Sequence, residues 1–379
     1  MKIAINTKCL QKDKLEGVGW FTYETLRRIT TSHPEHEFVF FFDRQFDASF
    51  IFSPNITPVI IPPRTRHLFL RWIWFEYSIP RIVKKIKPSI FVSPDGFLPL
   101  KITVPSLTVI HDLSFEHRPN DLPALFRNYC RHFFPRFARK ATRIVTVSSF
   151  SKEDIIRTYG IKKDKIDVAW CGVNQVFKPV DEHKKKSVRE QYTGGHPFFI
   201  CTGALHPRKN IENLMKAFDQ FKCLLSGIRD YTGIKLVFVG NPMFLTKSIF
   251  YTHRQLRHRK DIIFTGRLPN EELVKLTASA EALLLVSHFE GFGIPLLEAM
   301  NCDVPIIVSD CTALPEVAGS AGLYIQPDSF ESIAVAMHRI LDDSALKQAL
   351  IENGKKERER FSWDITANTL WKSIEEVSK

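Results

Sequence analysis

Short, uninterrupted apolar runs recur along the whole chain. Between them lie longer stretches in which apolar residues return every third or fourth position. Such runs are typical of parallel strands buried on both faces, and the longer period is typical of helices. The apolar runs predict strands at 2–6, 37–42, 57–61, 89–93, 105–110, 143–148, 198–202, 235–240, 262–266, 282–287 and 304–309. Strands that alternate with helices in both halves predict an α/β protein with two Rossmann-like sheets.

The helical period predicts helices in the segments between these runs. Helices are expected from residue 17 and at 126–141, 149–159, 211–221, 271–280, 330–342 and 344–360, with a last helix beginning at 361–364. Ser151 is the expected N-cap of the helix at 149–159, because a serine side chain can accept a hydrogen bond from a free amide there.

The pattern becomes polar and charged between residues 176 and 195, and we place a domain junction there. This divides the chain into an N-terminal domain over 1–178, a C-terminal domain over 190–361 and a final helix over 362–379. The lysine run at 184–186 is expected to be a solvated helix start.

The stretch from residue 288 to 310 carries the most chemical information. Glu290 begins a loop with two glycines, and Pro295 suits the first turn of the helix that follows. A Gly-rich loop between a strand end and a helix N-terminus is an anion site, because free amide N–H groups point outward there. Glu290 and Glu298 bracket this loop, and carboxylates accept hydrogen bonds from hydroxyl groups. A ligand with hydroxyls beside phosphates fits, which describes a nucleotide sugar.

Each residue of this stretch also has a plainer interpretation. Glu298 alone could complement the helix dipole, Glu290 could be a solvated loop residue, and Gly291 and Gly293 could be ordinary turn residues. The whole combination is much less expected by chance than any single member.

Seven residues separate Glu290 from Glu298, and this spacing resembles the signature of the retaining glycosyltransferases of family 4. The resemblance covers most of the chain. It implies a GT-B architecture, in which two Rossmann-like domains face each other across a cleft and a C-terminal helix crosses back to the first domain. It also implies an acceptor bound by the N-terminal domain and a nucleoside-diphosphate sugar donor bound by the C-terminal domain. The second half is similar to the mannosyltransferase-type branch, which favours GDP-mannose while leaving UDP-linked donors open.

Residues 203–210 (GALHPRKN) resemble the donor-phosphate motif of the family. Gly203 allows a tight exit from a strand, and Arg208 and Lys209 reach a helix N-terminus. Together the two cations can neutralise a diphosphate without a metal ion. Some relatives have an arginine directly after the glycine, where this chain has Ala204, and we expect Arg208 to substitute for it.

Further residues match positions that face the cleft in the family. His111 ends a buried strand at the binding edge of an open sheet, and the resemblance implies that it meets the transferred sugar near the reacting carbon. The segment that contains Gly17 and Gly19 matches a loop that faces the donor diphosphate. Gly240 and Arg267 lie at strand ends on the same cleft.

The resemblance also implies a division of roles. Glu290 is expected on the sugar hydroxyls and Glu298 on the ribose hydroxyls. Sugar and phosphate oxygens are expected to bind the amides of Gly291, Phe292, Gly293 and Ile294. Arg208 and Lys209 are expected to stabilise the leaving diphosphate, which itself can accept the acceptor proton because no general base is obvious. We expect no metal ion, since no Asp-x-Asp motif stands at a strand end, and no cofactor.

Composition narrows the setting. The 379 residues suffice for two domains, and 44% hydrophobic and 25% charged residues are typical of soluble globular proteins. No run of about 18 apolar residues predicts a transmembrane helix. The seven cysteines are scattered without metal-ligand spacing, which favours reduced thiols in the cytoplasm.

The formal net charge of +12 points to an anionic partner. No nucleic-acid-binding motif is visible, so phosphate-bearing substrates or an anionic membrane surface fit better. Residues 68–86 interleave aromatic and basic residues. This segment could lie on the inner face of a membrane, line an acceptor groove, or form a core helix with solvated basic residues.

Two other functions stay open at this point. One is a catalytically silent nucleotide-sugar-binding subunit of a biosynthetic complex, and the other is hydrolysis of a nucleotide sugar. The simultaneous presence of His111, Lys209, Glu290 and Glu298 favours transfer of a hexose to a glycan or lipid-linked acceptor, in cell-surface polysaccharide synthesis.

Overall fold

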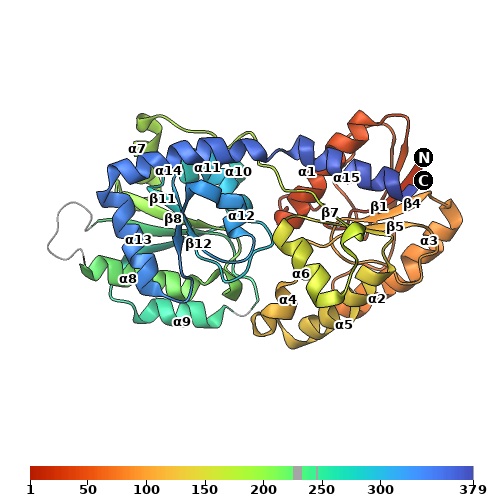
Figure 1. The fold of residues 1–379 in the computed structure, drawn as a ribbon, viewed down its shortest axis with the longest axis horizontal. Helices are drawn as coiled ribbons and strands as arrows, with labels where there is room; N and C mark the ends of the chain where they lie inside the picture. The colour runs from red at the N-terminus through yellow and green to blue at the C-terminus, as the bar shows by residue number, and fades with distance from the viewer. Residues whose placement is uncertain (225–232, 245, 379) are drawn as a thin grey trace. The chain divides into compact units, whose positions relative to one another are not determined.

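Figure 1 shows the computed structural model, which describes residues 1–224, 233–244 and 246–378. Internal contacts divide the chain into two compact units. Unit 1 consists of Met1–Pro119, Ala124–Gly172 and Ser362–Lys379, and unit 2 of Asn120–Pro123 and Val173–Phe361. The acceptor and donor roles expected for the two halves stay predictions.

Unit 1 is built on a sheet of seven parallel strands in the order β3-β2-β1-β4-β5-β6-β7. The strands are β1 (Lys2–Asn6), β2 (Glu37–Phe42), β3 (Ile56–Ile60), β4 (Ile90–Ser93), β5 (Ser106–Val109), β6 (Arg143–Thr146) and β7 (Ile166–Val168). Ile3 of β1 pairs with Phe38 on one side and with Ile90 on the other, and all three residues are fully buried. Burial on both faces explains why these strands appear as continuous apolar runs.

The helices of unit 1 are α1 (Gly17–Ser32), α2 (Leu68–Ile73), α3 (Ile79–Ile86), α4 (Ser114–His117), α5 (Ala124–Lys140), α6 (Ser149–Tyr159) and α15 (Trp363–Ser378). As expected, the last helix returns to the first unit, where α15 (blue) lies along α1 (red) in Figure 1. Arg28 of α1 donates a 2.6 Å hydrogen bond to Asp364 of α15. A Cβ atom at Gly172 would lie 2.2 Å from the amide nitrogen of Trp363, so only glycine allows this close packing.

The aromatic-basic segment at 68–86 is helical throughout, with a π-helical stretch, Trp74–Ser78, between α2 and α3. Trp74 and Phe75 are buried, and Trp74 Nε1 donates a 2.7 Å hydrogen bond to the carbonyl oxygen of Ile61. Phe69, in contrast, is 67% exposed. The segment is therefore partly a core element and partly an apolar surface.

The predicted N-cap of α6 is wrong by three residues. Ser148, rather than Ser151, precedes the helix with an extended backbone, and its hydroxyl accepts a 3.0 Å hydrogen bond from the Ser151 amide. The side chain of Ser151 is buried within the first turn. Backbone conformation, which the sequence of closely spaced serines does not fix, decides which of them caps.

Unit 2 is built on a sheet of six parallel strands in the order β10-β9-β8-β11-β12-β13. They are β8 (Phe198–Thr202), β9 (Lys235–Val239), β10 (Ile262–Gly266), β11 (Ala282–Leu285), β12 (Ile306–Ser309) and β13 (Gly322–Ile325). The sequence pattern missed β13, an edge strand that pairs only with β12 among the described strands and that exposes 37% of Tyr324. Half-exposed edge strands lack the continuous apolar run that reveals buried ones.

The helices of unit 2 are α7 (Glu182–Thr193), α8 (Ile211–Leu224), α9 (Lys247–Gln255), α10 (Asn270–Ala278), α11 (Ile294–Asn301), α12 (Leu314–Ala318), α13 (Phe330–Asp342) and α14 (Ser344–Glu357). Helices α8 and α13 pack side by side, and their apolar faces share one core with the sheet. Both units are thus doubly wound α/β sheets, as predicted. Within the described residues, no helix is long and apolar enough to span a bilayer.

Candidate active site

The two predicted cations of unit 2 follow directly from the exit of β8. Gly203 ends the strand with a φ of +104°, and a short 3₁₀ helix, Pro207–Lys209, leads into α8. A Cβ at Gly203 would lie 3.0 Å from Cε and 3.1 Å from Nζ of Lys209. The glycine therefore provides both the left-handed turn and the space through which the Lys209 side chain, only 9% exposed, passes.

Gly240 is required by an even closer approach of two strand ends. A Cβ at this position would lie 2.0 Å from the carbonyl oxygen of Gly203, and its φ of +151° disfavours other residues. Its amide donates a 2.9 Å hydrogen bond to the carbonyl oxygen of Gly266. The expected role of Gly240 at the ligand stays a prediction, while the structure gives it a packing role at the same sheet edge.

Glu290 forms ion pairs with both Arg208 and Lys209. Arg208 Nη1 lies 2.6 Å from Glu290 Oε2, and Lys209 Nζ lies 3.1 Å from Glu290 Oε1. Arg208 Nη1 also donates a 2.8 Å hydrogen bond to the carbonyl oxygen of Phe289. Three predicted residues from two distant segments therefore form one cluster, in which two positive charges face one negative charge and only Arg208 is partly exposed.

The charge state of Glu290 follows from this arrangement. Burial would raise the pKa of Glu290, but the positive charges of Arg208 and Lys209 and their hydrogen bonds outweigh it and lower the pKa to about 2. The hydroxyl of Ser287 donates a further 2.9 Å hydrogen bond to Oε1. Glu290 is thus a fixed carboxylate at neutral pH.

The loop after Glu290 leads into α11 as predicted. Gly293 has a φ of +111°, and a Cβ there would meet Leu314 Cδ2 at 2.9 Å. No side chain among the described residues caps the N-terminus of α11, which begins at Ile294. The ring of Phe292 is buried against Phe361, so this residue offers only its backbone to a ligand. The amides of 291–294 are therefore placed where an anion could use them.

Glu298, one turn into α11, has the opposite electrostatic environment. Burial raises the pKa of Glu298 to about 7, although the charge of Lys209 acts against the rise. Its carboxyl group forms no hydrogen bond with any residue in the described part of the chain. A partly protonated carboxyl group without a protein partner is suited to ribose hydroxyls, the role that the family resemblance implies and that stays a prediction.

Four supporting residues were not predicted. His206 accepts a 3.2 Å hydrogen bond from the Arg208 amide, and burial together with the Arg208 charge lowers its pKa to about 4. Asn210, at a φ of +59°, donates to the carbonyl oxygens of Val286 (3.1 Å) and Pro327 (2.6 Å). Ser287 and Thr312 hold Glu290 by its carboxylate and its amide. The contacts of Asn210 and Thr312 bridge up to 117 residues of sequence, which no local pattern indicates, whereas His206 and Ser287 contact residues two and three positions away.

Arg267 follows the end of β10 and is exposed. Its amide donates a 3.2 Å hydrogen bond to Asn241 Oδ1, which fixes the backbone at this strand end. The ion pairs of Glu290 that the structure gives are those with Arg208 and Lys209. The predicted contact of Arg267 with a donor stays a prediction.

Three predicted site residues lie in unit 1. Helix α1 begins at Gly17, where an added Cβ would meet nothing within 4 Å, whereas a Cβ at Gly19 would lie 3.0 Å from Leu15 Cδ2. His111 follows β5, and its Nε2 lies 2.8 Å from the carbonyl oxygen of Pro94, which can only accept. Nε2 therefore carries a proton. Burial lowers the pKa of His111, so the neutral ring keeps Nδ1 as an acceptor.

The electrostatics of unit 2 define what this arrangement can bind. Two cations, an uncapped helix N-terminus and glycine-bounded strand ends suit a diphosphate, and a carboxyl group without a partner suits hydroxyls. The ordered triad of Arg208, Lys209 and Glu290 also excludes a simple solvated-loop interpretation of Glu290.

Comparison with known proteins agrees with this geometry. Residues 15–176 match the model of Glycosyltransferase Family 4, and residues 182–357 match that of Glycosyl transferases group 1. O-antigen chain mannosyltransferase B of Escherichia coli is 27% identical over 397 residues, with 98% of each chain covered. O-antigen chain mannosyltransferase RfbU of Salmonella typhimurium is 29% identical over 277 residues, which cover 71% of this chain and 70% of the relative.

Solved structures show the same fold. The structure of HepE from Anabaena in complex with UDP-glucose has a TM-score of 0.76 at 15% identity, with 99% of this chain and 100% of that chain covered. The paired parallel sheets, the two matched models and the mannosyltransferase relatives lead to one assignment. The chain belongs to the family 4 glycosyltransferases, with the GT-B fold and a group 1 glycosyl transferase domain in unit 2.

Proposed function

We propose that this glycosyltransferase moves a hexose, with mannose favoured, from a nucleoside-diphosphate sugar to a glycan or lipid-linked acceptor in cell-surface polysaccharide synthesis. The transfer proceeds with retention at the anomeric carbon. Support comes from the two O-antigen chain mannosyltransferases among the relatives and from the UDP-glucose complex of HepE. The mannosyltransferase relatives favour GDP-mannose over a uridine-linked donor.

The observation that carries the proposal is the pairing of Arg208 and Lys209 with Glu290. A sugar-linked diphosphate brings two negative charges to the net positive cluster and gains another when the sugar leaves. At 4 Å, one pair of opposite unit charges is worth about 4 kcal/mol at an effective dielectric constant of about 20. Cations held in place before the reaction stabilise this developing charge without reorganisation, so the cluster favours the transition state over the bound substrate.

The remaining roles follow from charge and position. Glu290, ionised at neutral pH, accepts hydrogen bonds from hydroxyl groups of the transferred sugar. It also faces the sugar ring, which becomes positive as the bond to the diphosphate breaks. Glu298 holds the ribose hydroxyls, and the amides of 291–294 hold sugar and phosphate oxygens. His111 contacts the transferred sugar, and the leaving phosphate accepts the acceptor proton.

Release of nucleoside diphosphate tests the proposal against its rivals. The full chain is incubated with GDP-mannose, UDP-glucose and related donors, each with and without extracts containing glycan or lipid-linked acceptors. Release that depends on the acceptor supports transfer. Equal release without acceptor indicates a hydrolase, and donor binding without release under any condition indicates a silent binding subunit. Nuclear magnetic resonance of the product's anomeric proton decides between retention and inversion.

The setting at the inner face of a membrane is part of the same proposal. The net charge of +12 and the exposed ring of Phe69 in α2 support it. Co-sedimentation with anionic vesicles should fall as salt rises, because surface attraction is screened within about 10 Å at 0.1 M salt. No binding to vesicles at low salt would favour a freely diffusing enzyme with a soluble acceptor.

A further inference from the structure

The sheet of unit 1 has a point where its strand order reverses. The chain runs outward from β1 through β2 to β3 and then returns to place β4 on the other side of β1. In open α/β sheets, ligands bind in the crevice outside the carboxyl ends of the strands at such a point. Here the residues that follow β1 and β4 are Lys8 and Asp95.

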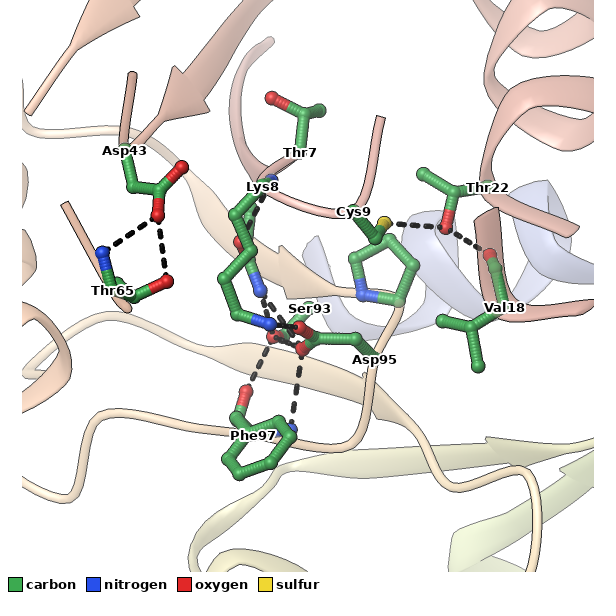
Figure 2. Close-up of polar contacts among 12 residues, drawn as sticks. Thr7, Lys8, Cys9, Val18, Thr22, Asp43, Thr65, Ser93, Asp95 and Phe97 are labelled. Carbon is green, nitrogen blue, oxygen red and sulfur yellow. Dashed lines mark hydrogen bonds and ion pairs between the residues drawn. The ribbon is translucent and has the colours of Figure 1, made fainter. Parts of the chain in front are cut away.

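Lys8 and Asp95 form a nearly buried ion pair between these strand ends (Figure 2). Their side chains are only 12% and 5% exposed. Asp95 Oδ1 is fixed by Asn6 Nδ2 at 2.8 Å and by the hydroxyl of Ser93 at 3.1 Å, while Oδ2 pairs with Lys8. An ammonium group has three N–H donors, and Asp95 is its one charged partner among the described residues. Lys8 thus keeps donors available for an anion.

Lys8 and a second cation, Arg71, both approach the aromatic ring of Phe97. Lys8 Nζ and the guanidinium carbon of Arg71 each lie 5.0 Å from the centroid of Phe97. Arg71 Nε is buried and, among the residues that the structure describes, the Arg71 side chain has no hydrogen-bond or ion-pair partner. The carboxyl group of Glu76, five residues further along the chain, accepts a 2.9 Å hydrogen bond from the Leu100 amide. The buried Nε–H of Arg71 is therefore a donor that an oxygen atom of a ligand can satisfy.

An apolar groove adjoins this pair of cations. Tyr129 lies 6.2 Å from Phe97, between ring centroids, and also lines a groove of about 440 Å³ between α2 and α5. The groove is lined by Leu68, Phe69, Trp72, Leu125, Asn128, Tyr129, His132 and Phe133. Phe69 and Leu125 are 67% and 74% exposed, an unusual exposure for two large apolar residues that line the same groove. Tyr129 therefore links the apolar groove to Phe97, the ring that both cations approach.

We propose that unit 1 binds an acceptor in which a phosphate is attached to a long apolar chain, with the phosphate on Arg71 and Lys8 and the apolar chain in the α2–α5 groove. This inference rests on the proposed function, because it names the class of its acceptor. Charge complementarity selects this occupant. A purely apolar partner would leave Arg71 without an acceptor, and a free glycan would leave the aromatic groove exposed to water.

Binding of dodecyl phosphate to the full chain, below its micelle-forming concentration, tests the proposal. All six tryptophans belong to unit 1, and Trp72 lines the groove, so tryptophan fluorescence reports this site. Dodecyl phosphate should bind at least tenfold more tightly than inorganic phosphate or dodecyl maltoside. Inorganic phosphate lacks the apolar chain, and dodecyl maltoside lacks the anionic group, so each comparison tests one part of the proposed recognition.

Two variants and their matched controls locate the site. Arg71→Ala should weaken dodecyl phosphate at least tenfold, whereas Arg66→Ala, which removes an exposed arginine of the same unit, should not. Leu125→Asp should weaken the binding of dodecyl phosphate similarly, because the new side chain places a carboxylate in the groove. Ile365→Asp, at another exposed apolar position, should not weaken this binding. Arg71→Lys, which keeps the charge, guards against misfolding of the alanine variant.

The outcomes separate this inference from its rivals. Equal affinities for dodecyl phosphate and dodecyl maltoside, or equal effects of Arg71→Ala and Arg66→Ala, would refute it. Loss of anionic-vesicle binding in Leu125→Asp without any binding of monomeric dodecyl phosphate would show a membrane-docking face instead. Calorimetry with GDP and UDP, whose proposed site is in unit 2, should give unchanged affinities in all variants. Failure of the wild type to bind either nucleotide would refute the proposed function without altering the dodecyl phosphate result.

Discussion

Replacing Glu290 by glutamine is the most informative single change at the donor site. The substitution keeps the shape of the side chain but removes the charge that holds Arg208 and Lys209. The pKa of Glu290 falls from an ordinary value of 4.5 to about 2 on folding. Each pKa unit corresponds to about 1.4 kcal/mol, so ionisation of Glu290 contributes about 3 kcal/mol to folding at neutral pH. Because the folded-state pKa is depressed, this contribution is present above about pH 4.5 and lost as the pH falls towards 2.

Glu290→Gln should therefore lower the stability of unit 2 by about 3 kcal/mol at pH 7 without nucleotide. A bound diphosphate replaces the lost carboxylate as the partner of both cations, so GDP or UDP should reduce this difference. For the same reason nucleotide affinity should stay equal or rise. The turnover number should fall by two or more orders of magnitude, if about 3 kcal/mol of transition-state stabilisation is lost with the charge.

Hydrogen exchange measured by mass spectrometry can resolve the stability effect by region, with β8 and β11 as reporters and the sheet of unit 1 as an internal reference. Tryptophan fluorescence cannot serve here, because all six tryptophans lie in unit 1. Glu281→Gln is the matched control, since Glu281 also bridges two cations, Arg189 at 2.9 Å and Lys347 at 2.6 Å, away from the proposed site. Reduced nucleotide affinity with unchanged turnover in Glu290→Gln would show that Glu290 only holds the donor.

Four further outcomes are expected. Lys209→Ala should weaken nucleoside-diphosphate binding by about 1.5–3 kcal/mol in calorimetry, because it removes a charge-assisted contact, and unchanged affinity would contradict its assignment. Nucleotide affinity should fall as the pH drops through about 7, because the raised pKa of Glu298 makes its carboxyl group neutral there and a poorer hydrogen-bond acceptor. Glu298→Gln should abolish this part of the pH dependence and should act mainly on KM. Turnover should survive EDTA, and complete loss that magnesium restores would show that the diphosphate site is misinterpreted. Gly17→Ala should leave the melting temperature unchanged, since its methyl group meets nothing within 4 Å, but it should lower the affinity for the donor if bare backbone approaches the phosphates there. Gly240→Ala should instead destabilise unit 2, because its Cβ would lie 2.0 Å from a carbonyl oxygen.

The strand pattern was readable because parallel strands are buried on both faces. Runs such as Glu37–Phe42 and Ala282–Leu285 contain almost no polar positions, so each was located to within a few residues. The edge strand Gly322–Ile325 escaped the same reasoning because its half-exposed residues carry no such run. At Ser148 and Ser151, composition indicated a cap, but only the backbone conformation identified the residue that provides it.

The sequence alone determined which residue types gather at the strand ends, since glycines, cations and carboxylates there follow local pattern and spacing. It did not determine their charge states. Glu290 and Glu298 are the same residue type within one motif, yet one has a pKa of about 2 and the other of about 7. The difference arises because Arg208 and Lys209, about eighty positions away in the chain, form ion pairs with Glu290, whereas burial dominates at Glu298. Likewise, the groove between α2 and α5 joins segments that no local pattern relates. Burial is largely a local property of the pattern, whereas electrostatic interaction depends on distances that only the tertiary structure sets.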